Sequence, residues 1–398
     1  MRRRALRAAA LATVLAASPA AAAQPDCGEA AWPLWQAFST HFVQADGRVL
    51  DASTPRLHSS SEGQSYGMFF ALVANDRTAF ERLWRWTVNN LASGDIGSRL
   101  PAWYWGRKDD GSWGILDDNS ASDADLWFAY ALLEAAGRWA RPDYQRDAQA
   151  LLARIESEEV ASLPGLGPML LPGRAHFERP DHLWQLNASY LPLPVLRRLA
   201  VASPKGPWAH IAENTAALLE AATPRGYVAD WVAYRATSPR RGLFVVDPVK
   251  GDVGSYDAIR AYLWAGMAAS SDPLSGRMLQ ALSGMAASTA STGIPPERVK
   301  TSTGLAEGSG PFGFSAALVP YFTARDQPWL ATMQRRRAEA LLRDSLQAAS
   351  AGQGRQPPYY DVVLSLFGLG WAEDRFRFLR TGQVQLSWEK TCQSATAR

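Results

Sequence analysis

Helical segments of two kinds alternate along the chain, and this alternation limits the possible folds more than any other feature. Residues 67–73, 126–133 and 258–269 are apolar on every side. The segments that follow them have one apolar face each: residues 77–91, 144–160 and 278–287. A helix that is apolar all round must be buried all round, whereas an amphipathic helix covers a core from the solvent side. The pattern therefore predicts buried inner helices, each followed by a covering outer helix.

The starts of the buried segments recur at spacings that suit helical hairpins. They lie near Glu62, Asp123, Asn187, Asp257, Gly313 and Tyr360, at separations of 61, 64, 70, 56 and 47 residues. Six such pairs that close into a ring form an all-α (α/α)6 barrel of six inner and six outer helices. This closure gathers the inner-helix starts at one end. Residues 242–247 give the best strand signal, so we expect at most minor β-strand content.

The N-terminus has the three parts of a secretory signal peptide. Four arginines precede a short apolar stretch at residues 8–17, and three alanines at residues 21–23 form a cleavage site. We therefore expect residues 1–23 to be a signal peptide. Residues 24–398 are expected to form one barrel domain, because no linker or low-complexity tract divides them. Neither this apolar stretch nor any later one is long enough to span a bilayer, so we predict a periplasmic or secreted protein without membrane insertion.

The charge of the expected mature chain is close to neutral. The full chain has 41 Lys plus Arg, and the predicted signal peptide removes four of them, which leaves 37 basic residues against 38 acidic ones. A basic patch that would hold nucleic acid or an anionic membrane is therefore not expected. The five His residues lack metal-ligand spacing, so no metal site is predicted.

The two cysteines, Cys27 and Cys392, lie at opposite ends of the expected mature chain. In an oxidising compartment they can join the termini through a disulfide; the alternative is two separate buried thiols. Both lie in short polar terminal segments, which favours the disulfide.

Two glycine-rich motifs match known signatures without the context that these signatures need. Residues 63–67 satisfy G-x-S-x-G, but the polar residues before them do not resemble the buried strand of a nucleophile elbow, so Ser65 is not predicted as a nucleophile. Residues 308–313 match G-x-G-x-x-G, but they follow a polar loop and include Pro311. A dinucleotide-binding fingerprint requires a preceding strand within a βαβ unit. No cofactor is therefore expected.

Acidic residues open three of the predicted buried helices. Asp123 and Asp125 precede one apolar run, and Glu62 and Asp257 stand at two other starts. Taken alone, such acids are capping groups that suit the positive end of a helix dipole. The barrel, however, brings Glu62, Asp123 and Asp257 to one end. A carboxylic acid and a carboxylate that face each other are the groups that split a glycosidic bond.

Aromatic residues supply the second signal of a sugar site. The chain has 16 Trp, and we expect at least half of them in the core. Those beside Gly and polar residues are better candidates for a groove that stacks sugar rings. They are Trp103, Trp105 and Trp231, together with Tyr190 in the segment that begins at Asn187.

Three segments resemble glycoside hydrolase family 8. Residues 121–125, with the small and apolar residues up to Trp139, follow the signature of this family, and Phe128 departs from its usual Ile or Met. Residues 61–68 are similar to the segment that bears the acid, and residues 255–260 to the segment that bears the base. The likeness is greatest to the periplasmic endoglucanases of bacterial cellulose-synthesis operons.

The resemblance implies an (α/α)6 barrel that hydrolyses β-1,4-glucan with inversion. By matched position, Glu62 is the general acid, Asp257 the general base, and Asp123 the residue that holds and helps distort the sugar. Together with the groove candidates, the predicted substrate contacts are Gln64, Trp103, Trp105, Asn187, Tyr190, Tyr256 and Arg260. Inversion needs room for a water molecule, so the carboxyls of Glu62 and Asp257 are expected about 6.5 to 9.5 Å apart.

Several alternatives stay open at this point. The protein can instead be a glucan-binding accessory protein without catalysis, or a family-8 hydrolase for chitosan, xylan or mixed-linkage β-glucan. A polysaccharide lyase is disfavoured by the few His and Lys residues. We expect a monomer whose partner is β-1,4-glucan, and a cellulose synthase or export complex is the further partner that the resemblance implies.

Overall fold

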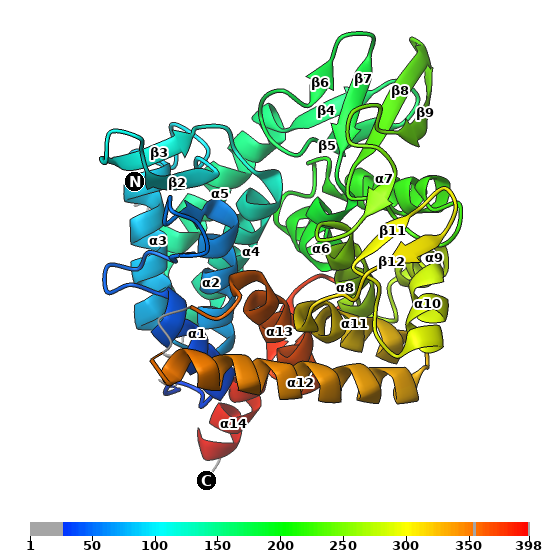
Figure 1. Cartoon of the computed structure of the whole chain (residues 1–398). Helices are drawn as coiled ribbons and strands as arrows, with labels where there is room; N and C mark the ends of the chain where they lie inside the picture. The colour runs from blue at the N-terminus through cyan, green and yellow to red at the C-terminus, as the bar shows by residue number, and fades with distance from the viewer. Residues whose placement is uncertain (1–26, 353–355, 397–398) are drawn as a thin grey trace, which may run out of the picture.

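The barrel is built from inner helices that are buried along most of their length. The computed structural model describes residues 27–352 and 356–396, so the predicted signal peptide at residues 1–23 lies outside the described residues. In the described part, six inner helices form the (α/α)6 barrel, which confirms the predicted fold class (Figure 1). They are α2 (Ser61–Val73), α4 (Ser122–Trp139), α6 (Leu193–Ala202), α8 (Ala258–Met267), α11 (Phe312–Ala324) and α13 (Tyr359–Ala372).

Aromatic rings from four inner helices meet inside the barrel. The ring of Phe69 in α2 lies 4.9 Å from that of Trp127 in α4. Trp127 is 5.5 Å from Trp264 in α8, and Trp264 is 5.1 Å from Phe367 in α13. These contacts join helices from distant parts of the chain. They help to hold the barrel together, because each aromatic side chain buries a large apolar area.

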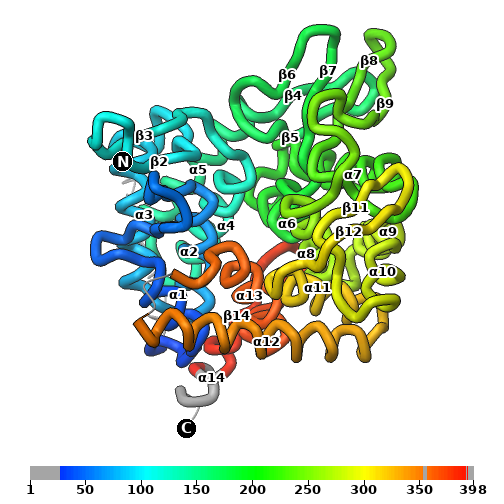
Figure 2. Tube along the Cα trace, in the orientation of Figure 1, coloured from blue at the N-terminus to red at the C-terminus, as the bar shows by residue number. Residues whose placement is uncertain are grey.

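Amphipathic outer helices cover the inner ones. They are α1 (Pro33–Phe42), α3 (Arg77–Leu91), α5 (Pro142–Glu158), α7 (Trp208–Ala222), α9 (Pro273–Ala281), α10 (Gly284–Thr292) and α12 (Pro328–Ser350). The predicted order of an inner helix followed by its outer helix holds for the first five inner helices. It fails for the sixth, since α1, the first helix of the described chain, packs on α13 (Figure 2). The ring of Phe42 in α1 lies 5.5 Å from that of Tyr359 in α13.

The third inner helix begins later than its predicted start near Asn187. A single 3-10 turn, η1 (Ala188–Tyr190), comes first, and α6 follows it only after Pro192. Proline lacks the backbone N–H that a helix interior uses and is favoured in the first turn, so Pro192 and Pro194 favour a helix that begins at Leu193. Asn187 and Tyr190 therefore lie in a connecting segment at the barrel end.

Short antiparallel strands are more numerous than predicted. They are β1 (Ser59–Ser60), β2 (Tyr104–Arg107), β3 (Trp113–Asp117), β4 (Val160–Leu163), β5 (Gly167–Leu170), β6 (Glu178–Arg179), β7 (Leu183–Leu186), β8 (Val232–Ser238), β9 (Arg241–Val246), β10 (Val253–Gly254), β11 (Arg298–Lys300), β12 (Leu305–Glu307), β13 (Phe376–Phe378) and β14 (Val384–Leu386). The expected strand at residues 242–247 corresponds to β9. Strands β1, β3, β7 and β10 come shortly before α2, α4, η1 and α8, so these sheets frame the end where the inner helices begin (Figure 1).

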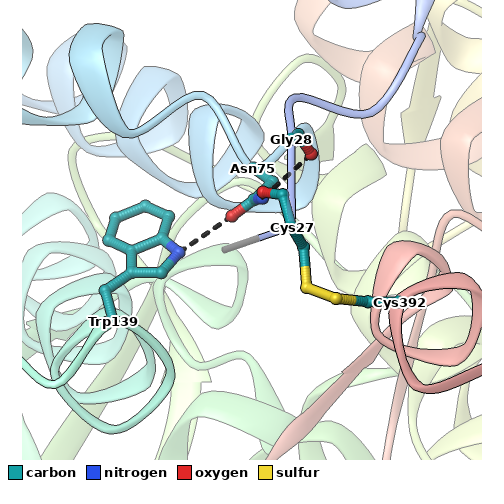
Figure 3. The surroundings of a disulfide bond; sticks show 5 residues. All are labelled: Cys27, Gly28, Asn75, Trp139 and Cys392. Carbon is teal, nitrogen blue, oxygen red and sulfur yellow. Dashed lines mark hydrogen bonds between the residues drawn. A yellow bond between two sulfur atoms is a disulfide. The ribbon is translucent and has the colours of Figure 1, made fainter. Parts of the chain in front are cut away.

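A disulfide between Cys27 and Cys392 joins the two ends of the described chain, which is the pairing that the sequence favours. Cys392 lies in α14 (Ser387–Thr396), the last helix. Figure 3 shows Asn75 beside this bond: its amide donates to the carbonyl oxygens of Cys27 and Gly28, and its Oδ1 accepts from Trp139 Nε1 at 2.9 Å. The termini are thus tied to the α2–α3 turn and to α4.

None of the helices in residues 27–352 and 356–396 combines the length and the apolar character that a membrane crossing requires.

Candidate active site

One buried guanidinium contacts all three predicted acids. Arg260, in the first turn of α8, donates from Nη1 to Glu62 Oε1 and to Asp123 Oδ2, the latter at 3.4 Å. Its Nη2 donates to Asp257 Oδ1 at 2.9 Å. Residues that are up to 198 positions apart in the chain therefore meet at one end of the barrel, as the alignment of the inner-helix starts predicts.

The three acids differ in exposure. The side chain of Asp123 is 1 % exposed, whereas those of Glu62 and Asp257 are 29 % and 33 % exposed. Glu62 and Asp257 are therefore accessible to substrate and water, while Asp123 forms the floor of the site. This difference in exposure allows Glu62 and Asp257 to exchange protons with a bound molecule, while the buried Asp123 can hold that molecule in position.

Burial also changes the acidity of Asp123. Loss of solvation, reinforced by the negative charge of Glu62, raises the pKa of Asp123 to about 8, although Arg260 opposes the shift. The raised pKa favours the protonated form of this carboxyl, which is able to donate a hydrogen bond as well as accept one.

Asn187 and Ser189 help to position the groups around Asp257. Asn187 Nδ2 donates to Asp257 Oδ2 at 3.3 Å, and its Oδ1 accepts from the backbone and hydroxyl of Ser189. Arg260 Nη2 donates to Ser189 Oγ at 3.1 Å, and the guanidinium carbon of Arg260 lies 5.6 Å from the ring centroid of Tyr190. The predicted residues Asn187 and Tyr190 are therefore beside the acids.

Asp230 holds the turn that presents Asp257, and sequence reasoning did not single it out. Its Oδ1 accepts hydrogen bonds from the backbone N–H groups of Ser255 at 2.7 Å and Ala258 at 2.8 Å. Burial raises the pKa of Asp230 to about 6. The only signal for it in the sequence is its place next to the groove candidate Trp231.

Of the predicted aromatic pair, Trp105 lies on β2 and Trp103 directly precedes this strand, which pairs with the strand before Glu62. The ring of Trp105 is stacked on that of Trp113 at 5.5 Å, and Arg48 lies 4.4 Å from the Trp105 ring centroid. Trp103 is stacked on Tyr104 at 4.7 Å. Ser60, the N-cap of α2, is in register with Tyr104, so these rings flank the start of the helix that carries Glu62. Trp113 is 46 % exposed and had not been predicted.

A second group of aromatic rings surrounds Trp231. Its ring is stacked on that of Phe177 at 6.0 Å with an interplanar angle of 6°, and Lys250 Nζ lies 5.4 Å from the Trp231 ring centroid. Tyr190 lies 6.5 Å from Trp231 and connects this group to the acids. Tyr256 is 43 % exposed, and its hydroxyl donates to Glu297 Oε1 at 3.3 Å, which places it on the outer part of the site.

The prediction that Gln64 binds substrate is wrong. Its side chain is fully buried, and its Oε1 accepts from the backbone N–H of Val49. Its Nε2 donates to the carbonyl oxygens of Gly47 and Leu83 and to Thr87 Oγ1. Gln64 follows Glu62 by two positions, and side chains so spaced on a helix point to different sides. It therefore ties α2 to α3 rather than contacting a ligand.

The two glycine-rich motifs have structural roles here. Residues 63–67 lie inside α2, where the hydroxyl of Ser65 donates to the backbone carbonyl of Glu62. Residues 308–313 lead from β12 into α11. In the described ranges, no group of three or more His, Cys, Asp and Glu residues is arranged to hold a metal ion.

A helical barrel with three carboxylates at one end, flanked by stacked aromatic rings, is the arrangement of a glycoside hydrolase. The model of glycosyl hydrolases family 8 matches residues 5–374. The chain belongs to this family.

Individual relatives agree with the assignment. An endoglucanase of Pseudomonas fluorescens (strain SBW25) is 51 % identical over 368 residues, which cover 91 % of this chain and 92 % of the relative. An endoglucanase of Xanthomonas axonopodis pv. citri is 48 % identical, with 99 % of both chains covered. The crystal structure of an endo-1,4-D-glucanase from Vibrio fischeri ES114 superposes with a TM-score of 0.84 at 39 % identity, covering 90 % of this chain and all of that one.

Proposed function

We propose that this glycoside hydrolase is an inverting endo-β-1,4-glucanase. The observation that carries the proposal is the single guanidinium of Arg260 that contacts Glu62, Asp123 and Asp257. The names of the relatives, endoglucanase and endo-1,4-D-glucanase, support a β-1,4-glucan as substrate.

The proposed reaction divides the chemistry between the two accessible acids. Glu62, as general acid, gives its proton to the oxygen of the leaving sugar while the bond to the anomeric carbon breaks. Asp257, as general base, takes a proton from a water molecule whose oxygen bonds to that carbon from the opposite face. Asn187 restrains the second oxygen of Asp257. A separation of about 6.5 to 9.5 Å between the two carboxyls stays a prediction of this mechanism.

Asp123 and the aromatic rings are assigned to substrate positioning. A protonated Asp123 is able to donate a hydrogen bond to a sugar oxygen, and its burial keeps water from competing for that bond. Trp103, Trp105 and Tyr190 provide apolar faces for pyranose rings, and Tyr256 and Arg260 support the base and the substrate. Stacking of a pyranose ring on an aromatic ring needs no charge on the sugar, so a site that binds by stacking favours an uncharged polymer.

The cellular role that we propose is the trimming or release of nascent cellulose in the periplasm during synthesis and export. The disulfide between Cys27 and Cys392 supports a location outside the cytoplasm, because such bonds persist in oxidising compartments. The protein is proposed to act as a monomer, and docking to a cellulose synthase or export complex is part of the proposal. Activity on chitosan, xylan or mixed-linkage β-glucan is the alternative within the family.

The test is hydrolysis of a panel of soluble β-glucans by the wild type, Glu62→Gln and Asp257→Asn. Loss of a general acid or base should lower kcat on carboxymethylcellulose by about 10²- to 10⁴-fold, with binding of cello-oligosaccharides retained. Glu339→Gln, an exposed acid in α12, is the matched control and should keep wild-type activity. Product anomers followed by NMR should show inversion.

Three outcomes would contradict parts of the proposal. Unchanged hydrolysis by Glu62→Gln would remove Glu62 as the acid. Binding of glucan by the wild type without any hydrolysis would indicate an accessory protein. Unsaturated sugar products would indicate a lyase.

A further inference from the structure

A second pair of acids lies behind Asp123, and the proposed reaction makes no use of it. Asp125 in α4 and Glu159 at the end of α5 are both fully buried, and their carboxyls are within hydrogen-bonding reach of each other. Neither oxygen of Asp125 and only one oxygen of Glu159 has another hydrogen-bond partner among the described residues. Three buried acceptor atoms are thus left without a donor.

In the described part of the chain, no ion pair joins a positively charged side chain to Asp125 or Glu159. Apart from their effect on each other, the ionisable groups that act most strongly on Asp125 and Glu159 are the acids Asp123 and Glu158, and Arg260 is already engaged by the three acids of the site. Two ionised carboxylates in contact repel each other strongly when buried. A proton between them removes one charge and turns one acceptor into a donor. Consistently, burial raises the pKa of Glu159 to about 8 and raises that of Asp125 well above its ordinary value.

Hydrogen bonds connect the pair to the start of α4, which carries Asp123, and to residues 171–174. Ser120 Oγ donates to Glu159 Oε1 at 2.6 Å and accepts from the backbone N–H of Arg174 at 3.0 Å. The backbone N–H of Leu171 donates to the carbonyl of Glu159 at 2.8 Å, and that of Ser122 donates to the carbonyl of Pro172 at 3.0 Å. The start of α4, the end of α5 and residues 171–174 therefore meet at these two carboxyls.

We propose that Asp125 and Glu159 share one proton and act as a positioning pair, which fixes the first turn of α4 and thereby the direction of Asp123. The effect on catalysis rests on the function proposed above, whereas the shared proton is a property of the fold. The pair is distinct from the three acids that face the substrate, because neither of its carboxyls is exposed.

The shared proton is tested by thermal unfolding between pH 5 and pH 9. The folded pair keeps a proton that the unfolded chain releases near pH 4, so the contribution of the pair to stability is greatest at the low end of this range and falls as the pH rises toward about 8. Asp125→Asn supplies a permanent donor in the same shape. Its Tm should fall less over this range than that of the wild type, by about 2–4 °C. Asp118→Asn, which removes an exposed acid near the pair, should follow the wild type.

The positioning role is tested by kinetics on carboxymethylcellulose. Asp125→Ala and Glu159→Ala should lower kcat by about 10- to 100-fold with little change in KM, because a small displacement of Asp123 disturbs the reacting geometry. Asp125→Asn and Glu159→Gln should recover most of this loss. Loss of fold alone would lower the yield of folded enzyme without this rescue of kcat by an amide.

The outcomes separate the two proposals. Parallel curves of Tm against pH for the wild type and Asp125→Asn would overturn the shared proton, whatever the substrate is. Equal kcat for the alanine and amide variants would overturn the positioning role. If the wild type hydrolyses no glucan, the proposed function fails, while the unfolding data still decide whether the pair holds a proton.

Discussion

At the scale of single residues, Arg260 is the positively charged side chain that contacts all three acids of the site. A guanidinium has five N–H donors in a fixed plane, so it can contact several carboxylates at once, which a single ammonium group cannot do with the same geometry. Arg260 uses this plane to contact Glu62, Asp123 and Asp257 and the hydroxyl of Ser189. The three acids of the site therefore share one charged partner.

Arg260→Lys should keep the charge but lose most of these contacts. Complete removal of a buried charged partner costs about 3–5 kcal/mol, so we expect a loss of stability below that limit, because the charge stays, and a fall in kcat/KM of about 100-fold, because the ammonium cannot contact all three carboxyls in the same geometry. Thermal unfolding and steady-state kinetics are the measurements. Arg335→Lys in α12, where the ion pair with Glu339 is exposed, is the control and should change neither. Full activity of Arg260→Lys would contradict this account.

Trp105→Ala tests the stacking platform. Loss of a ring that packs on a sugar removes about 1.5–3 kcal/mol of apolar burial, so the Kd for cello-oligosaccharides should rise about tenfold or more. Trp329→Ala is the matched control, since Trp329 is 54 % exposed at the start of α12. Binding measured by calorimetry should distinguish the two, and equal affinities would exclude Trp105 from the binding surface.

At the scale of elements, close contact between inner helices depends on residues without side chains. A Cβ at Gly368 in α13 would lie 1.9 Å from the carbonyl oxygen of Ala316 in α11. One at Gly266 in α8 would lie 2.3 Å from the backbone N of Tyr321. Three neighbouring inner helices thus approach each other through glycine, which helps the ring to close.

Gly368→Ala should therefore destabilise the barrel even though alanine favours helices. Overpacking of a tight contact costs about 1–3 kcal/mol or more, because two helices must move apart. Gly276→Ala in α9 is the matched control: nothing lies within 4 Å of its added Cβ, so it should be neutral or stabilise by up to about 1 kcal/mol. Denaturant unfolding measures both variants, and equal free energies of unfolding would refute the close-contact argument.

At the scale of the whole molecule, both ends of the chain complete the ring. The first helix, α1, covers α13, and the disulfide joins positions separated by 365 residues. A cross-link over so long a stretch restricts the unfolded chain strongly in the entropic description of disulfides. The terminal connection thus stabilises an architecture whose first and last elements are neighbours.

Reduction of the disulfide, or the double variant Cys27→Ser with Cys392→Ser, should lower the free energy of unfolding by about 2–5 kcal/mol. Thermal unfolding with and without reductant measures the change. The double variant should not respond to reductant, and it serves as the control. Mass spectrometry with and without reductant should show the loss of the bond. An identical Tm in both conditions would show that the bond does not stabilise the fold.

Local patterns were sufficient to predict the barrel and the positions of the acids. Apolar runs such as residues 126–133 have to be buried wherever they lie, and acids at helix starts follow the inner helices to one end. Side-chain direction was not predictable in the same way. Gln64, two residues after Glu62, turns to α3 because hydrogen-bonding partners on other elements decide where a buried amide lies.

The amino-acid sequence by itself determined that apolar inner helices alternate with amphipathic outer ones, because helical periodicity and apolar content are local properties. Only the tertiary structure decided that α1 covers α13, that Arg260 contacts three acids, and that Asp125 meets Glu159. These contacts join residues far apart in the chain. Their geometry depends on how the helices close into a barrel, and a local sequence pattern cannot predict that closure in detail.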